Sequence, residues 1–259
     1  MNLHSNKYRY ILLCFLLFSL SGYNHAQEFS AKLHWSQRVE LGFAVSGIVE
    51  KVSVNVGNTV KKGDALVQLD NDVFRADVKK NRALLVSAQE TLNEAVRERD
   101  RARELYERTV LSDHDLQVAK NNLKSSKAEL EQVRARLIAS QHDLKYSIIR
   151  APFDAVVLQR YVQPGQVIAT QFRQDPLIVI AASNKMMAQF FVTENKLNEV
   201  TKNKPVKIVV SGENYVGKII AIGLELVEGD SSSSGYPVEV EFSVKKILRA
   251  GRAAKVEIE

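Results

Sequence analysis

Two stretches of this sequence, 43–70 and 148–180, repeat one another, so that Gly57 corresponds to Gly165, at an offset that is constant except for a three-residue slip near Phe172. Each stretch alternates β-branched with polar residues and is punctuated by glycine, which predicts short strands joined by tight turns. So few strands cannot bury a sheet face alone. The two stretches must therefore pack together as one pseudo-symmetric β sandwich, and the residues between them must leave it as an insertion.

The insertion, from about 72 to 144, contains neither proline nor glycine and is rich in helix-forming residues. A heptad seam runs through each of its halves, with smaller residues in the first half. The seam residues are Leu85, Ala88, Leu92, Ala95, Arg99, Ala102 and Tyr106, then Leu116, Ala119, Leu123, Ser126, Leu130, Val133, Leu137, Ser140 and Leu144. This pattern predicts an antiparallel coiled-coil hairpin whose arms, at about 1.5 Å per residue, extend for about 50 Å.

The connection between the two helices is short. The first helix is expected to end near Arg108, and Ser112, with Asp115 three residues later, forms a capping box for the second. Strand signals return after residue 182 and predict a small β barrel over 182–259. Within it, Thr193 is expected to cap a short helix. Residues 27–42 are interpreted as an N-terminal segment with a strand that leads into this barrel.

Residues 1–26 have the organisation of a secretory signal: a basic start, an apolar run and then small or polar residues up to Ala26. The run is about half of the ~20 residues needed to cross a bilayer. Cleavage near Ala26 is expected, with an uncleaved anchor as the alternative. The one cysteine, Cys14, lies in this leader, so the mature chain has no cysteine, which suits the periplasm.

The charge of the chain argues against nucleic-acid binding. The formal net charge is +6, and basic residues alternate with acidic ones along the helical middle, as in 97–101. This order gives no single-sign run in the sequence for a phosphate backbone to follow. We expect no nucleic-acid partner.

Taken together, residues 43–259 resemble the periplasmic adaptor, or membrane fusion, proteins of tripartite efflux systems, the HlyD-like family. The resemblance lies in two half motifs separated by a heptad hairpin, and in the final turn of the barrel. The motifs are Gly47-Ile48-Val49 through Val60-Lys61-Lys62-Gly63 to Leu69-Asp70, then Ile149-Arg150-Ala151-Pro152-Phe153-Asp154 with Pro164-Gly165, and finally Leu248-Arg249-Ala250-Gly251. Ala155 departs from the pattern, because the family usually has glycine there.

The resemblance implies an elongated α+β fold: a lipoyl-like sandwich formed by 43–71 and 145–181, interrupted by the hairpin 72–144 and followed by the barrel. It also implies a non-enzymatic adaptor without cofactors that forms a hexamer-like ring. Such an adaptor links an inner-membrane transporter of the resistance-nodulation-division (RND) type to a TolC-type outer-membrane channel. The alternatives are an adaptor of an ABC or type I secretion exporter, or a structural coiled-coil envelope protein.

In adaptors that dock on TolC-type channels, the hairpin tip has an Arg, a Leu four residues later and a Ser seven further on. Arg101, Leu105 and Ser112 fit this spacing and are the candidate docking residues. Arg donates to exposed carbonyl groups and Leu fills a groove. Each residue also has a structural interpretation: Ser112 as a helix cap, Arg101 as the partner of acids one turn away, and Leu105 as part of the seam.

Four other kinds of chemistry have less support in the sequence. Lys61 and Lys62 flank a turn and are interpreted as solvated residues, not as a swinging-arm attachment site. Scattered histidines offer no metal-ligand spacing. The pair Met186 and Met187 is interpreted as packing, with a soft-metal role as the alternative. Ser112, His114 and Asp115 crowd one helix start without the arrangement of a hydrolase triad.

Overall fold

A computed structural model of the chain describes residues 27–170, 176–228 and 234–258. The predicted leader, 1–26, lies outside the described residues. The chain divides into two compact units, one formed by Arg38–Ser183 and the other by the residues before and after it. In the described parts, none of the helices combines the length and apolarity needed to cross a membrane.

The first unit contains the sandwich, which consists of two four-stranded sheets ordered β2-β9-β7-β4 and β6-β5-β3-β8. Each sheet includes strands from both halves of the repeat, because β4 pairs with β7 and β3 pairs with β8. The strands are β2 (Arg38–Leu41), β3 (Gly47–Val52), β4 (Thr59–Val60), β5 (Ala65–Leu69), β6 (Ile148–Arg150), β7 (Ala155–Arg160), β8 (Val167–Ile168) and β9 (Ile178–Ala182).

Reciprocal hydrogen bonds join the two halves at their equivalent glycines. The amide of Gly57 donates to the carbonyl of Val157, and the amide of Gly165 donates to the carbonyl of Val49, each at 2.8 Å. In return, the amides of Val157 and Val49 donate at 2.9 Å to the carbonyl of the residue that follows each glycine. Both glycines have left-handed φ angles, 89° and 83°, which glycine adopts without steric cost. The predicted pseudo-symmetric sandwich is confirmed.

The expected lead-in segment, 27–42, divides between the two units. Its first part is β1 (Gln27–Trp35), a barrel strand, whereas β2 pairs with β9 of the sandwich. The segment thus contains a barrel strand and, in addition, a sandwich strand that the sequence analysis did not identify. The reason is the repeat itself: β2 pairs with β9 as β6 pairs with β5, so each half begins one strand before its glycine pattern.

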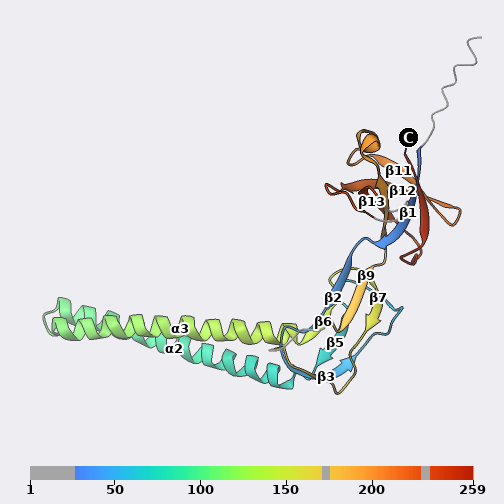
Figure 1. The fold of residues 1–259 in the computed structure, drawn as a ribbon. Coiled ribbons are helices and arrows are strands. Elements are labelled where there is room, and N and C mark those ends of the chain that lie inside the picture. Colours follow the sequence, from blue (N-terminus) through green and yellow to red (C-terminus); the bar gives the residue numbers. More distant parts are fainter. Residues whose placement is uncertain (1–26, 171–175, 229–233, 259) are drawn as a thin grey trace, which may run out of the picture. The chain divides into compact units, whose positions relative to one another are not determined.

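The helical hairpin leaves the sandwich from two neighbouring strands. Gln68 of β5 pairs with Ile148 of β6, and the amide of Leu69 donates to the carbonyl of Ser147 at 2.9 Å. The helices α2 (Asp72–Glu107) and α3 (Asp113–Tyr146) begin and end beside these strands, and Figure 1 shows them lying side by side. Their 36 and 34 residues correspond to about 50 Å each at about 1.5 Å per residue.

The heptad seam forms the contact between α2 and α3, which confirms the coiled-coil hairpin. Its buried members are Ala88 and Ala102 of α2 and Leu116, Ala119, Leu123, Leu130, Val133 and Ser140 of α3, and Val78 of α2 is buried one heptad before the predicted seam begins. Tyr106 was expected in the seam but is 41% exposed, so the seam of α2 ends at Ala102. The reason is that α2 ends one residue later, at Glu107, and the chain turns away there.

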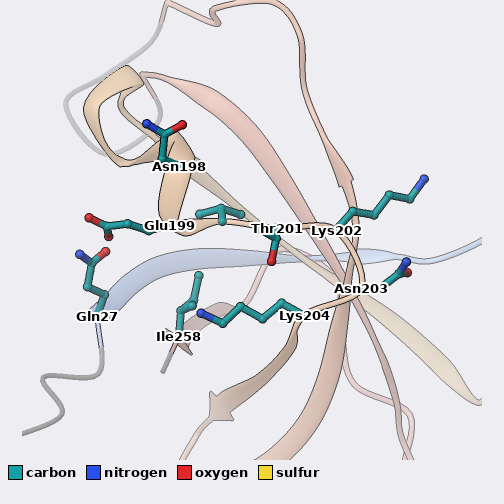
Figure 2. Close-up of a pocket in the computed structure, with 9 residues that line it drawn as sticks. Gln27, Asn198, Glu199, Thr201, Lys202, Asn203, Lys204 and Ile258 are labelled. Atoms are coloured by element: carbon teal, nitrogen blue, oxygen red, sulfur yellow. The ribbon is translucent and has the colours of Figure 1, made fainter.

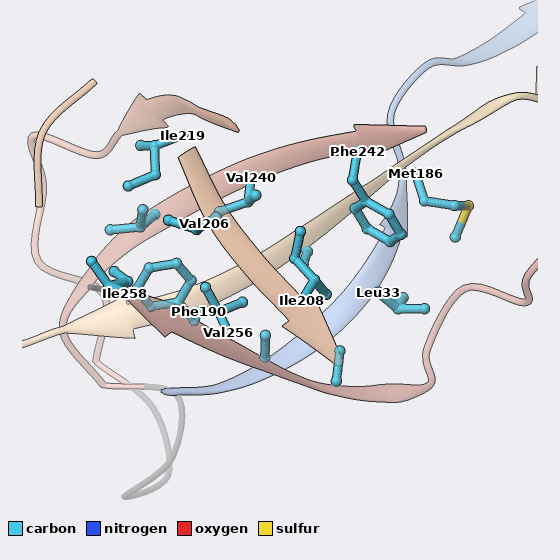
Figure 3. Packing of buried hydrophobic residues seen from close by; sticks show 14 of the residues in the cluster. Leu33, Met186, Phe190, Val206, Ile208, Ile219, Val240, Phe242, Val256 and Ile258 are labelled. Atoms are coloured by element: carbon cyan, nitrogen blue, oxygen red, sulfur yellow. The ribbon is translucent and has the colours of Figure 1, made fainter. Parts of the chain in front are cut away.

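The second unit is a closed six-stranded barrel ordered β1-β10-β13-β12-β11-β14. Its inward positions alternate along each strand and form one apolar core that includes Phe190, Ile208 and Phe242 (Figure 3). The strands after β1 are β10 (Lys185–Val192), β11 (Pro205–Val210), β12 (Glu213–Ile222), β13 (Tyr236–Ser243) and β14 (Ala253–Ile258).

The short helix of the barrel unit differs from expectation. It is a 3-10 helix, η1 (Glu194–Glu199), and the side chain of Thr193 makes no capping hydrogen bond. The prediction of a Thr193 side-chain cap is therefore wrong. In a 3-10 turn the backbone satisfies itself at shorter range, and the amide of Lys196 donates to the carbonyl of Thr193 at 3.0 Å.

Gly217 of β12 leaves no room for a side chain inside the barrel. A Cβ atom there would lie 2.6 Å from Cδ1 of Ile208 and 2.8 Å from the backbone oxygen of Glu241. We expect Gly217→Ala to lower the free energy of unfolding by about 1–3 kcal/mol, the usual cost of overpacking, as measured by denaturant titration.

The matched control is Val216→Ala. Val216 is the neighbouring residue of the same strand and is 78% exposed, so its truncation should change stability by less than about 0.5 kcal/mol. Equal effects of the two substitutions would contradict the packing assigned to Gly217.

Candidate functional site

The tip of the hairpin is a tight turn of five residues between α2 and α3. Thr109 has a left-handed φ of 59°, and the amide of Val110 donates to the carbonyl of Leu105 at 3.0 Å. Leu111 packs against the end of the seam, whereas Val110 is 71% exposed. The turn is thus fixed by its backbone and by Leu111, and it leaves one aliphatic side chain in solvent at the apex.

Ser112 is the N-cap of α3, as the sequence predicted. Its Oγ accepts a hydrogen bond from the backbone amide of Asp115 at 3.2 Å and donates to the carboxylate of the same residue at 2.6 Å. The carboxylate of Asp115 accepts from the Ser112 hydroxyl, and no hydrogen bond from the Ser112 amide to this carboxylate is present in the described hairpin, so the capping box is incomplete. The acids Asp113 and Asp115 lie in the first turn, where the helix dipole favours them.

Arg101 and Leu105 lie four residues apart, one turn from each other, in the last two turns of α2. The side chain of Arg101 is 63% exposed and pairs with Glu98 at 2.9 Å. Leu105 is half-buried and lies one turn beyond Ala102, where the seam of α2 ends. The structure therefore places all three candidate residues within the last turns on either side of the tip, and it gives Arg101 and Ser112 local hydrogen bonds as well.

Sequence reasoning missed Val110 as a tip residue. The signal was present, because Val110 is an aliphatic residue in the connection between the helices and occupies no heptad position. The apex and the three candidate residues together form the surface that we call the tip site.

A groove lies along one side of the hairpin below the tip. It has a volume of about 510 Å³ and an apolar floor formed by Tyr106, Leu116 and Leu123. Five of its other lining residues are cationic and one is acidic. These residues are Arg99, Arg103, Lys120, Lys124 and Lys127, and Glu107. We call this surface the basic groove.

A larger hollow, of about 760 Å³, lies in the barrel unit between the ends of β1 and β14 and the turn after η1 (Figure 2). Its lining includes Glu199, Lys202 and Lys204 but neither histidine nor serine. Within the described ranges, no group of three or more His, Cys, Asp or Glu side chains is arranged to hold a metal ion. The hollow therefore lacks a recognisable catalytic arrangement among these residues.

The other candidate residues lie in structural settings. The amides of Lys61 and Lys62 donate to the carboxylates of Asp64 and Asp154, each at 2.8 Å, which fixes a turn. Met186 is fully buried in the barrel core, which confirms its packing role, and Met187 is half-buried on the outer face. The hydroxyl of Ser112 is committed to the α3 cap.

Relatives of known sequence match most of this chain, but the share of their own length that the match covers differs. Uncharacterized protein YdhJ of Escherichia coli (strain K12) is 27% identical over 203 residues, which is 76% of this chain and 70% of YdhJ. Efflux pump periplasmic linker BepD of Brucella suis biovar 1 (strain 1330) is 24% identical over 177 residues, 68% of this chain. The chain spans only 44% of BepD.

Solved structures share the fold. The membrane fusion protein Spr0693 of Streptococcus pneumoniae R6 superposes with a TM-score of 0.68 at 15% identity, over 90% of this chain and 99% of that one. The family described as CzcB-like, barrel-sandwich hybrid domain matches residues 38–182, which include both halves of the sandwich and the whole hairpin. Because this match covers more than half of the 259 residues, the chain belongs to the CzcB-like barrel-sandwich hybrid family, that of the membrane fusion or periplasmic adaptor proteins.

Proposed function

We propose that this protein is a non-enzymatic periplasmic adaptor that links an inner-membrane transporter of the RND type to a TolC-type outer-membrane channel. In this proposal several copies assemble into a hexamer-like ring, and substrate passes through the assembly without being changed. The leader is cleaved near Ala26, and the mature chain stays associated with the inner membrane. Family membership supports the adaptor role, and the two partner types and the ring are the finer part of the proposal.

The observation that supports this function most is the hairpin itself. Two helices of 36 and 34 residues bury only a narrow seam against each other and end in a tip with an exposed aliphatic residue, Val110. A coiled coil of about 50 Å contributes reach and a long surface for recognition. Its function is therefore best explained by contact with another protein at the tip.

The tip site supplies the groups for such a contact. Arg101 can exchange its exposed pairing with Glu98 for carbonyl groups of a partner helix, at little cost because surface pairs contribute about 0–1 kcal/mol. Leu105 and Val110 add apolar area, and Ser112 holds the start of α3 in place. We propose Arg101, Leu105 and Ser112 as channel-docking residues, with Val110 beside them.

The transporter type separates the main proposal from its alternatives. A transporter of the RND type encoded beside this chain, and recovered with it after cross-linking in the envelope, supports the main proposal. Recovery of an ATPase-driven exporter instead would favour the ABC or type I secretion alternative. Recovery of neither transporter would favour a structural coiled-coil role.

The docking surface is tested with a photo-crosslinking amino acid at Val110 of the exported protein. We expect cross-links to the outer-membrane channel, and we expect Arg101→Glu combined with Leu105→Asp to reduce them at least about tenfold, because both a donor and an apolar contact are lost. Circular dichroism should show unchanged helicity.

Arg97→Glu is the matched control for this variant. Arg97 forms the same kind of pair, with Glu94 three residues before it, but lies one turn farther from the tip. It should leave the cross-links intact. Undiminished cross-linking in the Arg101 and Leu105 double variant would refute the docking role of these residues.

Ser112 requires a separate test, because a cap and a docking residue respond to different substitutions. Ser112→Asp keeps a capping oxygen, whereas Ser112→Ala removes it and should cost about 1 kcal/mol of helix stability. If the hydroxyl also contacts the channel, both variants lose cross-links from Val110 while only the alanine variant loses thermal stability. Full cross-linking in Ser112→Asp would mean that Ser112 acts as a cap alone.

A further inference from the structure

The charges beside the seam of the hairpin are sorted by sign. Each helix has two rows of residues that flank its seam. On each helix, one of these rows lies on the side of the basic groove. Arg103 of α2 and Lys120 and Lys127 of α3 belong to these groove-side rows and line the groove. We treat the groove-side residues of both helices as one row. The other row lies across the seam from the groove.

Between Val78 and Leu144, the row on the groove side contains five cations and one acid, Asp113 at the start of α3. The cations are Arg82, Arg103, Lys120, Lys127 and Arg134, and we call them the basic flank. The row on the other side contains four acids and one cation. These residues are Glu98, Asp115, Glu129 and Asp143, which we call the acidic flank, together with Arg136. Charges that alternate along the sequence are thus separated in space by the fold.

This arrangement does not stabilise the hairpin that contains it. Flanking positions of a coiled coil commonly form salt bridges between helices, and these set partner and orientation. Within the hairpin, all of whose residues are described, every ion pair lies inside one helix and none crosses between α2 and α3. Cations of α2 instead face cations of α3 across the groove, as Arg103 and Lys120 do, which is unfavourable for an isolated hairpin.

The basic groove also contains a polar atom that lacks a hydrogen-bond partner. Arg99 occupies a seam position, its side chain is 31% exposed, and its Nε is buried without a hydrogen-bond partner. The carboxylate of Asp100 lies 2.9 Å from this Nε but outside hydrogen-bond geometry. Arg103 pairs with Glu107 of its own helix, whereas Lys120, Lys124 and Lys127 form no ion pair within the described hairpin. A partner that brings carboxylates to this groove would therefore pair with these three lysines and cover an apolar floor.

We propose that the partner of the basic flank is the acidic flank of a second copy of this chain. Both complementary surfaces are present on one molecule, at the same heights along the hairpin, so parallel copies present them to each other. Because different surfaces meet, the contact is heterologous, and its repetition generates a ring when the rotation between copies closes. The inference deepens the proposed function: it names the surfaces through which the ring would form.

The proposal is tested by cysteine cross-linking between copies. Val96 belongs to the groove-side row and Asn122 to the opposite row, and neither is charged. The contacts of Ala88 with Leu130 and of Ala102 with Leu116 fix the hairpin register. Val96 and Asn122 therefore lie at nearly the same height.

Two differently tagged full-length copies, both with Cys14→Ser, are co-expressed, one with Val96→Cys and the other with Asn122→Cys. A short bis-maleimide is then added to the intact envelope. We expect cross-links between the two kinds of copy and few within either kind. Links of Val96→Cys to itself, or no link at all, would overturn the proposal, whether or not the chain binds a channel.

Charge reversal gives an independent measurement in the same assay. We expect Lys120→Glu with Lys127→Glu to lower the cross-link yield at least about tenfold, since acids would then face acids. Adding Glu98→Lys and Glu129→Lys to the same chain restores opposite signs and should restore the yield.

The control, Lys79→Glu with Lys80→Glu, makes the same change in net charge on exposed residues outside both flanks and should have little effect. Loss in the control as large as in the flank variant, or no recovery in the fourfold variant, would contradict the proposal. Links to the channel from Val110 are read in parallel, so failure of assembly and failure of docking remain distinguishable.

Discussion

Reciprocal backbone hydrogen bonds between the two halves of the sandwich determine the rest of this structure. Val49 and Gly165, and Gly57 and Val157, bond across the halves in the same way, so neither half can complete its sheet without the other. Residues that are distant in sequence are thereby brought together, and β5 and β6 become neighbours. The segment between β5 and β6 must therefore leave the sandwich and return to it at neighbouring strands, as an antiparallel helix pair does.

This origin explains the properties of the hairpin. Its arms end on paired strands without a linker, since the amide of Leu69 bonds to the carbonyl of Ser147 where α3 ends. The seam consists of small and medium side chains and forms a narrow contact between α2 and α3. The residues on the outer sides of the two helices therefore take no part in holding the hairpin together. Those surfaces are available for partners at the tip and along the flanks. An adaptor uses such a division, because the sandwich fixes the base of the hairpin and the exposed surfaces make the contacts.

Much of this architecture could be predicted from the sequence, because its strongest signals are local and periodic. Glycine positions with left-handed φ, a heptad seam without proline or glycine, and a serine at a helix start each have one dominant physical cause. The strand β2 was not identified from the sequence because a four-residue edge strand has no signal apart from its pairing with β9. The prediction of a Thr193 side-chain cap was wrong because capping preference does not distinguish an α-helix from a 3-10 turn.

The candidate site was predictable in part, for related reasons. Arg101, Leu105 and Ser112 lie near the tip because hairpin geometry follows from the seam, whereas Val110 was missed because no periodic pattern includes it. The sorting of charges into flanks required the fold, since Lys120 and Arg103 become neighbours only when α2 and α3 pair.

The central claim, that the two halves form one cooperative unit, is tested most directly by amide hydrogen exchange in the intact mature chain. The informative amides are those of Val49, Gly57, Val157 and Gly165, which form the reciprocal bonds. The account predicts that all four exchange with one opening free energy and one denaturant dependence, because opening either half breaks all four bonds. Exchange of one half's amides while those of the other half stay protected would contradict it.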